Sequence, residues 1–466
     1  MRYVSTRGAA PALDFEGALL AGLAADGGLY LPEAWPSLGA AELRALRGLP
    51  YAEAAARIMA PFAEGCFSLG ELRALTSAAY APFRHAAVAP LRQLGANDWL
   101  LDLTQGPTLA FKDYALQLVG LLFDRVLARR GERLTILGAT SGDTGAAAIA
   151  ACEGRANLEV FILYPEGRVS EVQRRQMTTV AARNVHAVAI EGTFDDCQDI
   201  VKALFAERGF RQEARLAAVN SINWARVVAQ IVYYVTSALA LGAPDRPVAF
   251  SVPSGNFGNV FAGFAALRMG LPVARLIVGS NRNDVLTRFF DTGAMSLGPV
   301  HPTLSPSMDI QISSNFERFL FELYDRDGAA VAALLGKLRR ERRFEVSADL
   351  LQRARGWFAA ARFDDEETVR AIAEIHQRSG IVVDPHTAVG ILAAEARRPA
   401  PEVPVIAIAT ADPAKFPDAV ERAIGIRPVS PPAIGDLHAR PERRHLLPND
   451  ADAVRRFISA RLQEAS

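Results

Sequence analysis

The chain contains very little lysine. Of its 466 residues, 51 are lysine or arginine, and the lysines are Lys112, Lys202, Lys337 and Lys415. A guanidinium group stays protonated, so arginine cannot act as a neutral amine. A buried lysine loses its charge more easily and can form a Schiff base with a carbonyl group. A lysine kept among so many arginines is therefore a candidate for chemistry that arginine cannot perform.

Cysteine is also scarce, and neither sign of charge is in excess. Cys66, Cys152 and Cys197 are scattered and show no metal-ligand spacing, which indicates a reducing compartment. Lys+Arg and Asp+Glu both number 51, and no basic stripe favours nucleic acid as a partner. The N-terminus lacks the apolar core of a signal peptide, and no apolar run reaches the roughly 18 residues of a membrane span. We therefore expect a soluble cytoplasmic protein that binds no membrane.

The length of the chain predicts two or three domains. Residues 1–95 show helical apolar spacing interrupted by turns, so we expect an added N-terminal helical domain. After residue 98, short apolar runs alternate with helical stripes, which indicates an α/β fold with a mainly parallel sheet. The candidate strands are Leu134–Leu137, Val160–Leu163, Val185–Ile190, Leu216–Val219, Val248–Val252, Leu276–Val278, Ile381–Val383 and Val405–Ala409.

Lys112 lies in a distinctive stretch, LTQGPTLAFKDYALQ. A turn at Gly106 and Pro107 precedes it, and an apolar helical stripe begins at Tyr114. We therefore expect Lys112 at the start of a helix rather than on an outer helical face. The alternative is a surface lysine without a function.

Two predicted strands are followed by loops rich in glycine and small polar residues. The first loop, GATSGDTG at 138–145, and the second, SGNFGN at 254–259, each precede a predicted helix. Backbone N–H groups at a helix N-terminus favour an anion such as a phosphate or carboxylate. The same residues can also be ordinary helix caps. Together with an isolated lysine, the two loops suit a ligand with two anionic ends and a carbonyl that an amine can trap.

Other motifs narrow the choice of chemistry. Neither loop matches GxxxxGK[ST] or GxGxxG, so a P-loop or a dinucleotide site has little support, and no HExxH or Cys/His cluster predicts a metal. His386 follows a predicted strand and either faces the site or is a satisfied residue at a helix start. Thr410 ends another predicted strand, and its hydroxyl either meets a ring nitrogen or belongs to an ordinary turn.

Segments along nearly the whole chain resemble the threonine synthases, enzymes of fold type II that depend on pyridoxal phosphate (PLP). These segments are YVSTRG, DGGLYLP, GPTLAFKDYALQ, GATSGDTGAAA, EGTFDDCQ, SINWARVVAQIVYY, VPSGNFGN, SPSMDIQISSNFER, DPHTAVG and TADPAKF. The resemblance implies a tryptophan synthase β-like fold with two parallel-sheet domains and the N-terminal helical domain. Residues 131–224 would form a small α/β domain. Residues 96–130 and 225–466 would form the large PLP-binding domain, with a helical insertion at about 310–375.

The resemblance also implies roles for single residues. Lys112 would hold PLP covalently and act as the catalytic base, and Asp143 would lie near the cofactor ring. The residues expected to bind the cofactor phosphate are Gly255, Asn256, Phe257, Gly258 and Asn259, and Thr410 would bond the pyridine nitrogen. Those expected to bind the substrate, chiefly its carboxylate, are Thr140, Ser141, Gly142 and Thr144. Candidates for binding the substrate phosphate are Asn281, Asn283, Ser313, Ser314, Asn315 and Arg318. Asp412 departs from the family pattern, because many relatives carry histidine there.

The reaction implied is the last step of threonine biosynthesis, in which O-phospho-L-homoserine and water give L-threonine and inorganic phosphate. The alternative is a PLP-dependent phospho-lyase that acts on phosphorylated hydroxyamino acids and releases a keto acid and ammonia. A rival from another class is a non-catalytic phosphate-binding protein, which predicts a colourless preparation. We expect a small-molecule substrate, no nucleic-acid partner, and a monomer or homodimer.

Overall fold

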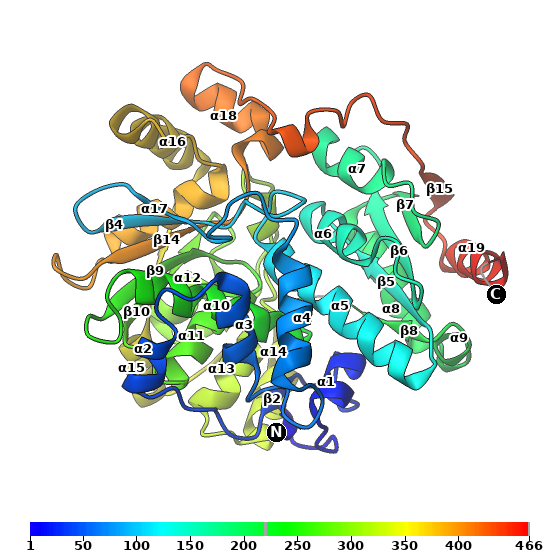
Figure 1. Cartoon of the computed structure of the whole chain (residues 1–466), viewed down its shortest axis with the longest axis horizontal. Coiled ribbons are helices and arrows are strands. Elements are labelled where there is room, and N and C mark those ends of the chain that lie inside the picture. The colour runs from blue at the N-terminus through cyan, green and yellow to red at the C-terminus, as the bar shows by residue number, and fades with distance from the viewer. Residues whose placement is uncertain (219–220, 465–466) are drawn as a thin grey trace.

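The computed structural model describes residues 1–218 and 221–464, which form two parallel-sheet layers side by side (Figure 1). The larger sheet has six strands in the order β13-β10-β9-β14-β4-β3. Their bounds are Phe358–Arg362, Val273–Ser280, Val248–Pro253, Val405–Ala409, Asp98–Asp102 and Leu91–Gln93. β3 runs antiparallel to β4, and the other pairings are parallel.

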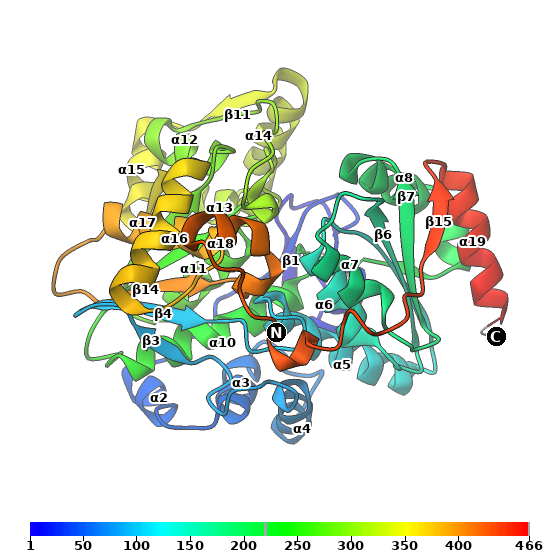
Figure 2. The same cartoon turned by 90° about the horizontal axis from the view of Figure 1, so that it is seen from above.

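The smaller sheet has five strands in the order β15-β7-β6-β5-β8, with parallel pairings. Their bounds are His445–Pro448, Val185–Glu191, Leu158–Pro165, Leu134–Ala139 and Leu216–Ala217. β15 comes from the part of the chain that the sequence assigned to the large domain. It pairs with β7, and the following helix, α19 (Ala451–Glu464), packs on α8 (Phe194–Ala206). The C-terminal segment therefore belongs to the small sheet (Figure 2).

Helices cover both faces of each sheet, because parallel strands buried on both sides need two apolar layers. The helices that contact strands of the large sheet are α11 (Gly258–Arg268), α12 (Val285–Thr292), α15 (Ala348–Trp357) and α17 (Pro385–Ala396). Further helices pack on these or on one another: α5 (Lys112–Arg130), α10 (Trp224–Ala240), α13 (Phe316–Leu323), α14 (Gly328–Glu341), α16 (Asp365–Ser379) and α18 (Pro417–Ile424). On the small sheet, α6 (Asp143–Cys152) and α7 (Glu171–Thr178) lie opposite α8, α9 (Arg208–Glu213) and α19. Short pieces complete the chain: β11 (Ala294–Ser296), β12 (Arg343–Glu345), η1 (Pro306–Met308), η2 (Pro413–Lys415) and η3 (Pro432–Ile434).

The N-terminal block shares its core with the large sheet. It contains β1 (Tyr3–Ser5), α1 (Phe15–Ala21), β2 (Tyr30–Pro32), α2 (Ala40–Ala45), α3 (Tyr51–Met59) and α4 (Leu69–Tyr80). Helices α3 and α4 pack on α10 and α5, and their apolar residues join the main hydrophobic core. Arg7, from the YVSTRG segment, forms two hydrogen bonds of 3.0 Å with the Glu317 carboxylate on α13. The block therefore supports the helices that carry the site.

Some expected elements differ from those observed. Ile381–Val383 is not a strand but the link between α16 and α17, with its apolar side chains in the core between these helices and the sheet. The expected helical insertion at about 310–375 contains β13, which pairs with β10 at the sheet edge. The strand expected at Leu216–Val219 is observed at Leu216–Ala217, and Val219 lies outside the described residues.

None of the helices in the described ranges combines the length and the apolarity that crossing a membrane requires.

Candidate active site

A cleft of about 690 Å³ lies at the carboxyl ends of the strands, which is where parallel α/β sheets bind ligands. Its walls are Phe111, Lys112, Asp143, Thr144, Ser221, Arg226, Gln230, Pro253, Ser254, Gly255, Asn256, Phe257, Gly258, Asn259, Ser307, Met308, His386, Thr410 and Ala411. The structure thus brings the predicted lysine, the SGNFGN loop and Thr410 to one cavity.

Lys112 is the first residue of α5 and is 9% exposed. The loop before it is joined to the loop after β14, because Phe111 N–H donates to the Thr410 carbonyl at 2.9 Å and Asp412 N–H donates to the Leu109 carbonyl at 2.9 Å. Burial is the largest influence on the amine and lowers the pKa of Lys112, while the Asp143 carboxylate acts in the opposite direction. A lowered pKa favours the neutral, nucleophilic form of the amine.

Asp113, the next residue, anchors the turn that presents Lys112. Its carboxylate accepts hydrogen bonds from Thr108 N–H at 2.8 Å and from Thr108 Oγ1 at 2.6 Å. A Cβ at Gly106 would lie 2.4 Å from the Asp113 Cβ, so this close approach requires glycine. Burial raises the pKa of Asp113 to about 6, although the hydrogen bonds from Thr108 oppose the rise.

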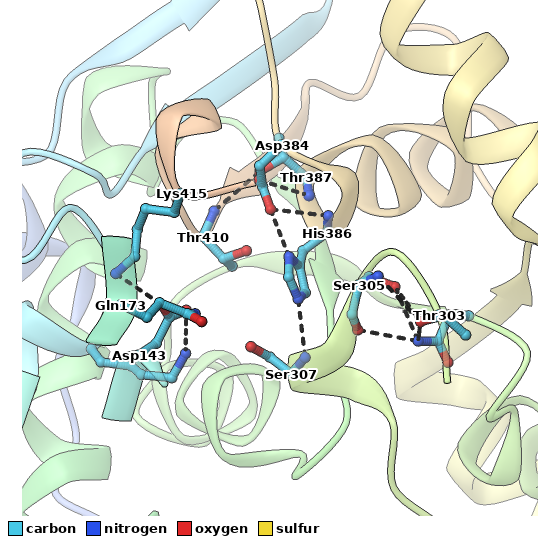
Figure 3. Close-up of polar contacts among 12 residues, drawn as sticks. Asp143, Gln173, Thr303, Ser305, Ser307, Asp384, His386, Thr387, Thr410 and Lys415 are labelled. Carbon is cyan, nitrogen blue, oxygen red and sulfur yellow. Dashed lines mark hydrogen bonds and ion pairs between the residues drawn. The ribbon is translucent and has the colours of Figure 1, made fainter. Parts of the chain in front are cut away.

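Asp143, at the start of α6, pairs with both lysines of the site. Figure 3 shows Lys415 and Gln173 beside it. Lys112 Nζ lies 3.2 Å from Asp143 Oδ2, Lys415 Nζ lies 2.8 Å from Oδ1, and Gln173 Nε2 donates to Oδ1 at 2.8 Å. Burial disfavours the charged carboxylate, but the two lysines outweigh burial and hold the pKa of Asp143 well below its usual value. Asp143 is therefore an anion at neutral pH.

The SGNFGN loop is held from behind by residues of the SSNFER segment. Ser313 Oγ donates to the Gly255 carbonyl at 2.7 Å, and Asn315 N–H and Nδ2 both donate to the Asn256 carbonyl at 3.1 Å. A Cβ at Gly255 would lie 3.0 Å from Met308 Cα. Because the first N–H groups of a helix have no intrahelical acceptor, the start of α11 can bind an anion in the cleft.

Asn259 provides a direct test of whether an anion fits there. The hydroxyl groups of Tyr233 and Tyr234 donate to its Oδ1 at 2.7 and 2.8 Å, which fixes the orientation of the amide. Its Nδ2 is buried without a protein acceptor, and Asn259 lies on the cleft wall. A buried donor without a partner costs about 1–3 kcal/mol, so the site is built for an acceptor group such as a phosphate.

Thr410 and His386 are organised by one carboxylate, Asp384 (Figure 3). Asp384 accepts from Thr387 N–H at 3.1 Å, and Thr387 Oγ1 in turn accepts from Thr410 N–H at 3.2 Å. His386 Nδ1 lies 2.6 Å from Asp384, and its Nε2 accepts from Ser307 N–H at 3.2 Å. His386 therefore carries its proton on Nδ1 and is both a satisfied residue at a helix start and part of the cleft wall.

The GATSGDTG loop contributes fewer wall residues than expected. Thr140 Oγ1 accepts from Gly142 N–H at 3.0 Å and from Gly145 N–H at 2.8 Å, which caps the start of α6, and Ser141 is exposed. Gly142 has φ +139°, and a Cβ there would meet the Gln173 side chain at 2.4 Å. Asp143 and Thr144 reach the cleft.

The candidates for the substrate phosphate support the walls from outside. Asn281 Nδ2 and Asn283 Nδ2 donate to Asp309 at 2.8 and 2.9 Å, and Arg318 is fully buried with Nε donating to the Tyr30 carbonyl at 3.1 Å. The six candidates, all within the described residues, are absent from the cleft wall: Asn281, Asn283, Ser313, Ser314, Asn315 and Arg318. Asp412 also lies outside the wall, where it accepts from Ala414 N–H at 2.9 Å and caps η2.

Sequence reasoning missed Arg226 and Gln230, which face the cleft from α10. Their spacing of four residues within an otherwise apolar helix placed them on one face and was the available signal. Burial lowers the pKa of Arg226 to about 10. Lys415 was also not predicted as a site residue, although lysine is scarce in this chain, and it is buried beside Asp143.

Comparison with protein families matches three consecutive parts of the chain. Residues 2–80 match the family described as "Threonine synthase N terminus", residues 82–335 match "Pyridoxal-phosphate dependent enzyme", and residues 387–458 match "Threonine synthase, C-terminal".

Relatives of similar length match the chain from end to end. A threonine synthase from Pseudomonas aeruginosa is 54% identical over 98% of both chains, and one from Corynebacterium glutamicum is 44% identical over 98% of both. Among solved structures, a PLP-bound threonine synthase from Brucella melitensis is 50% identical with a TM-score of 0.97, over 99% of both chains.

Proposed function

The chain belongs to the threonine synthases, PLP-dependent enzymes of fold type II, and from this premise we propose that it converts O-phospho-L-homoserine and water into L-threonine and inorganic phosphate. The observation that supports this most directly is that Lys112 and the SGNFGN loop line one cleft. When bound, PLP supplies a sink for the negative charge that develops on substrate carbons.

The residues of the cleft fit such a cofactor. Lys112 would bind its aldehyde carbon covalently, and the range Gly255–Asn259 would bind its phosphate through the N-terminus of α11 and the unpartnered Nδ2 of Asn259. Thr410 lies on the same wall, and its hydroxyl would bond the ring nitrogen. A hydroxyl would not force that nitrogen to carry a proton, as a carboxylate would, and so it would moderate the electron demand that the cofactor supplies.

Lys112 moves the protons of the reaction. The conversion needs a proton removed from Cα and another from Cβ of the substrate before phosphate leaves Cγ and water adds to Cβ. Burial lowers the pKa of Lys112, which favours the neutral amine that can accept these protons. Thr144 reaches the cleft and orients the substrate there, and Thr140, Ser141 and Gly142 hold the shape of that loop. Asp143 lies beside Lys112, near the position expected for the cofactor ring.

The thiols and the net charge of the chain bear on its compartment and its partners. All three thiols are free, which suits a reducing cytoplasm. The net charge of zero gives nucleic acid no electrostatic attraction. We propose a monomer or homodimer that acts on a small molecule and needs neither a nucleic acid nor a membrane.

We also propose that the chain is divided into three units. An N-terminal unit comprises residues 1–95, and a large unit comprises residues 96–130 together with the chain from 225 to the end of α18. The small unit comprises residues 131–224 together with β15 and α19, because β15 extends the sheet built by that range.

The experiment that tests the proposed function compares purified wild type with Lys112→Ala. Wild type should show a visible absorbance band that borohydride abolishes, and it should release threonine and phosphate in equal amounts from O-phosphohomoserine. Lys112→Ala should lose the band and turnover, whereas Lys337→Ala, which removes an exposed lysine, should keep both. A keto acid and ammonia in place of threonine would instead indicate a phospho-lyase.

A further inference from the structure

We propose that Lys415 is a positioning residue that keeps Asp143 paired while Lys112 changes its bonding partners during catalysis. The proposal rests on the proposed function of Lys112 as the residue that binds the cofactor. It assigns a role to a second lysine in a chain that has four.

Lys112 and Lys415 occupy different positions around Asp143. Lys112 lines the cleft, whereas Lys415 is 0% exposed and stands behind Asp143, toward which it points in Figure 3. Lys415 Nζ lies 2.8 Å from Asp143 Oδ1 and donates to the Thr108 carbonyl at 2.7 Å. Gln173 completes the environment of Asp143 with a bond of 2.8 Å. Lys415 is thus fixed on two sides and cannot reach a ligand.

The energetic reason follows from the burial of Asp143, whose side chain is 3% exposed. A buried carboxylate that loses its cation is strongly destabilised, because its desolvation is no longer offset. Lys112 must leave this ion pair whenever it becomes neutral or binds another group. Lys415 keeps the carboxylate paired at those moments, so the pair with Lys112 can break without leaving a bare buried charge.

The same arrangement controls how readily Lys112 gives up its proton. Four charged or titratable groups face Lys112 or share its cleft: Asp143 on α6, Lys415 on η2, Arg226 on α10 and His386 on α17. With Lys415 present, two cations share one carboxylate, and each repels the proton of the other. Without Lys415, Asp143 would act on Lys112 alone and would stabilise its charged form.

The test measures how fast full-length protein, freed of cofactor, binds added PLP at a series of pH values. Binding consumes the neutral amine of Lys112, forms a C=N bond to the aldehyde carbon and releases the aldehyde oxygen as water. For Lys415→Met we expect the midpoint of this pH profile to move about one unit toward alkaline pH, with a similar plateau. Below the midpoint the rate should then be roughly tenfold lower than in wild type.

Three further variants separate this role from a structural one. Lys415→Arg keeps the charge and should keep the wild-type midpoint. Lys202→Met removes an exposed lysine paired with Asp199 and should change nothing. Lys415→Met combined with Asp143→Asn removes both charges, so the alkaline shift should disappear, and the double variant should melt at a higher temperature than Lys415→Met alone.

The proposal is overturned if the midpoint of Lys415→Met equals that of wild type, or if its rate falls equally at every pH. It is also overturned if the double variant keeps the shift or is no more stable than Lys415→Met. Borohydride reduction of wild type followed by peptide mapping distinguishes a failure of the proposed function from a failure of the role proposed for Lys415. An adduct on a lysine other than Lys112 would refute the proposed function itself, whereas an adduct on Lys112 with unchanged Lys415→Met kinetics would refute only the role of Lys415.

Discussion

Two bulky residues adopt a left-handed backbone in the loops that meet at the cleft. Leu109 and Phe257 both have φ of 61°, a conformation that costs of order 1–3 kcal/mol for residues with a Cβ. The surroundings compensate for this cost. Asp412 N–H donates to the Leu109 carbonyl, and the Phe257 ring packs on Phe316 at 5.0 Å between centroids. Both loops are therefore fixed before a ligand arrives.

Replacing Phe257 with alanine should weaken both the fold and cofactor binding. The ring is 1% exposed, so its loss should lower the free energy of unfolding by about 3–5 kcal/mol. The loosened loop should bind PLP roughly tenfold more weakly. Urea denaturation and fluorescence titration with PLP measure the two effects. Phe344→Ala removes an equally buried ring on β12, so it should lower the free energy of unfolding without weakening PLP binding. If both variants lost the same affinity for PLP, the role of the loop would be contradicted.

Asp113 makes stability depend on pH in a defined direction. Its pKa rises from 3.8 to about 6 on folding, so between these values the folded protein holds a proton that the unfolded chain has released. The contribution of Asp113 therefore favours folding below about pH 4 and is lost as the pH rises through 6, a change of about 3 kcal/mol. Wild-type unfolding free energy minus that of Asp113→Asn should fall by this amount across the window. Asp418→Asn, an exposed control, should give a flat difference, and a flat curve for Asp113→Asn would contradict the prediction.

Sequence patterns indicated which segments line the cleft, but they did not show whether a given side chain points into the cleft or into the core. Lys112 and the SGNFGN loop stood out because a turn, a glycine and a helix start leave local signals. Arg318 has the chemistry of a phosphate ligand, but it lies fully buried against the Tyr30 carbonyl. Arg226 stood out in an apolar helix, but the sequence did not show that this face of α10 lines the cleft, because that depends on tertiary packing.

Among the secondary structure elements, strands that are uninterrupted apolar runs were predictable, and strands with charged or polar residues at their ends were not. β5, β6, β7 and β9 are runs of apolar residues between turns, and their positions were expected. β4, which reads DWLLD, was missed because aspartate stands at both ends. Its place in the sheet depends on pairing with β14, a contact distant in sequence. Ile381–Val383 shows the reverse case, because an apolar run in the core need not have a neighbouring strand.

The start of α6 should tolerate no side chain at position 142. Gly142→Ala would meet the Gln173 side chain at 2.4 Å in a backbone conformation with φ +139°, so we expect a loss of about 1–3 kcal/mol in unfolding free energy. It should also lower activity, because Gln173 bonds Asp143. Gly209→Ala, in α9 with open space around it, should be neutral or stabilise by up to about 1 kcal/mol. Thermal denaturation and turnover of both variants provide the measurement, and similar behaviour would contradict this account.

At the scale of the whole molecule, the chain passes from the large sheet back to the small one through a strap, residues 426–444. Ile434 and Leu437 of the strap are buried with Leu109, Val172 and Ala414, where both sheets' loops meet. Further along, Glu442 pairs with Arg174 and accepts from Thr178 Oγ1 at 2.7 Å, and Arg444 Nη1 lies 2.6 Å from Glu166. Sequence patterns could not show this return, because β15 is only four residues long and is a strand only through its pairing with β7, which is distant in sequence.

Truncating Ile458 on α19 should loosen the small sheet selectively. Ile458 is fully buried against the core of α8 and the small sheet, so Ile458→Ala should cost about 2–5 kcal/mol. Hydrogen exchange should increase in β5, β6 and β7. Ile372→Ala, an equally buried residue on α16, should increase exchange beside the large sheet instead. Exchange rising in the same peptides for both variants would refute the assignment of the C-terminal segment to the small unit.

The strap also determines how the two halves can move. Figure 1 shows it crossing on one side of the molecule, while α5 leads into the small sheet on another. The chain also returns to the large unit before α10, so together with α5 and the strap it makes three connections between the units. Opening of the cleft should therefore be a small movement restrained at three places, which would keep Asp143 paired with the two lysines.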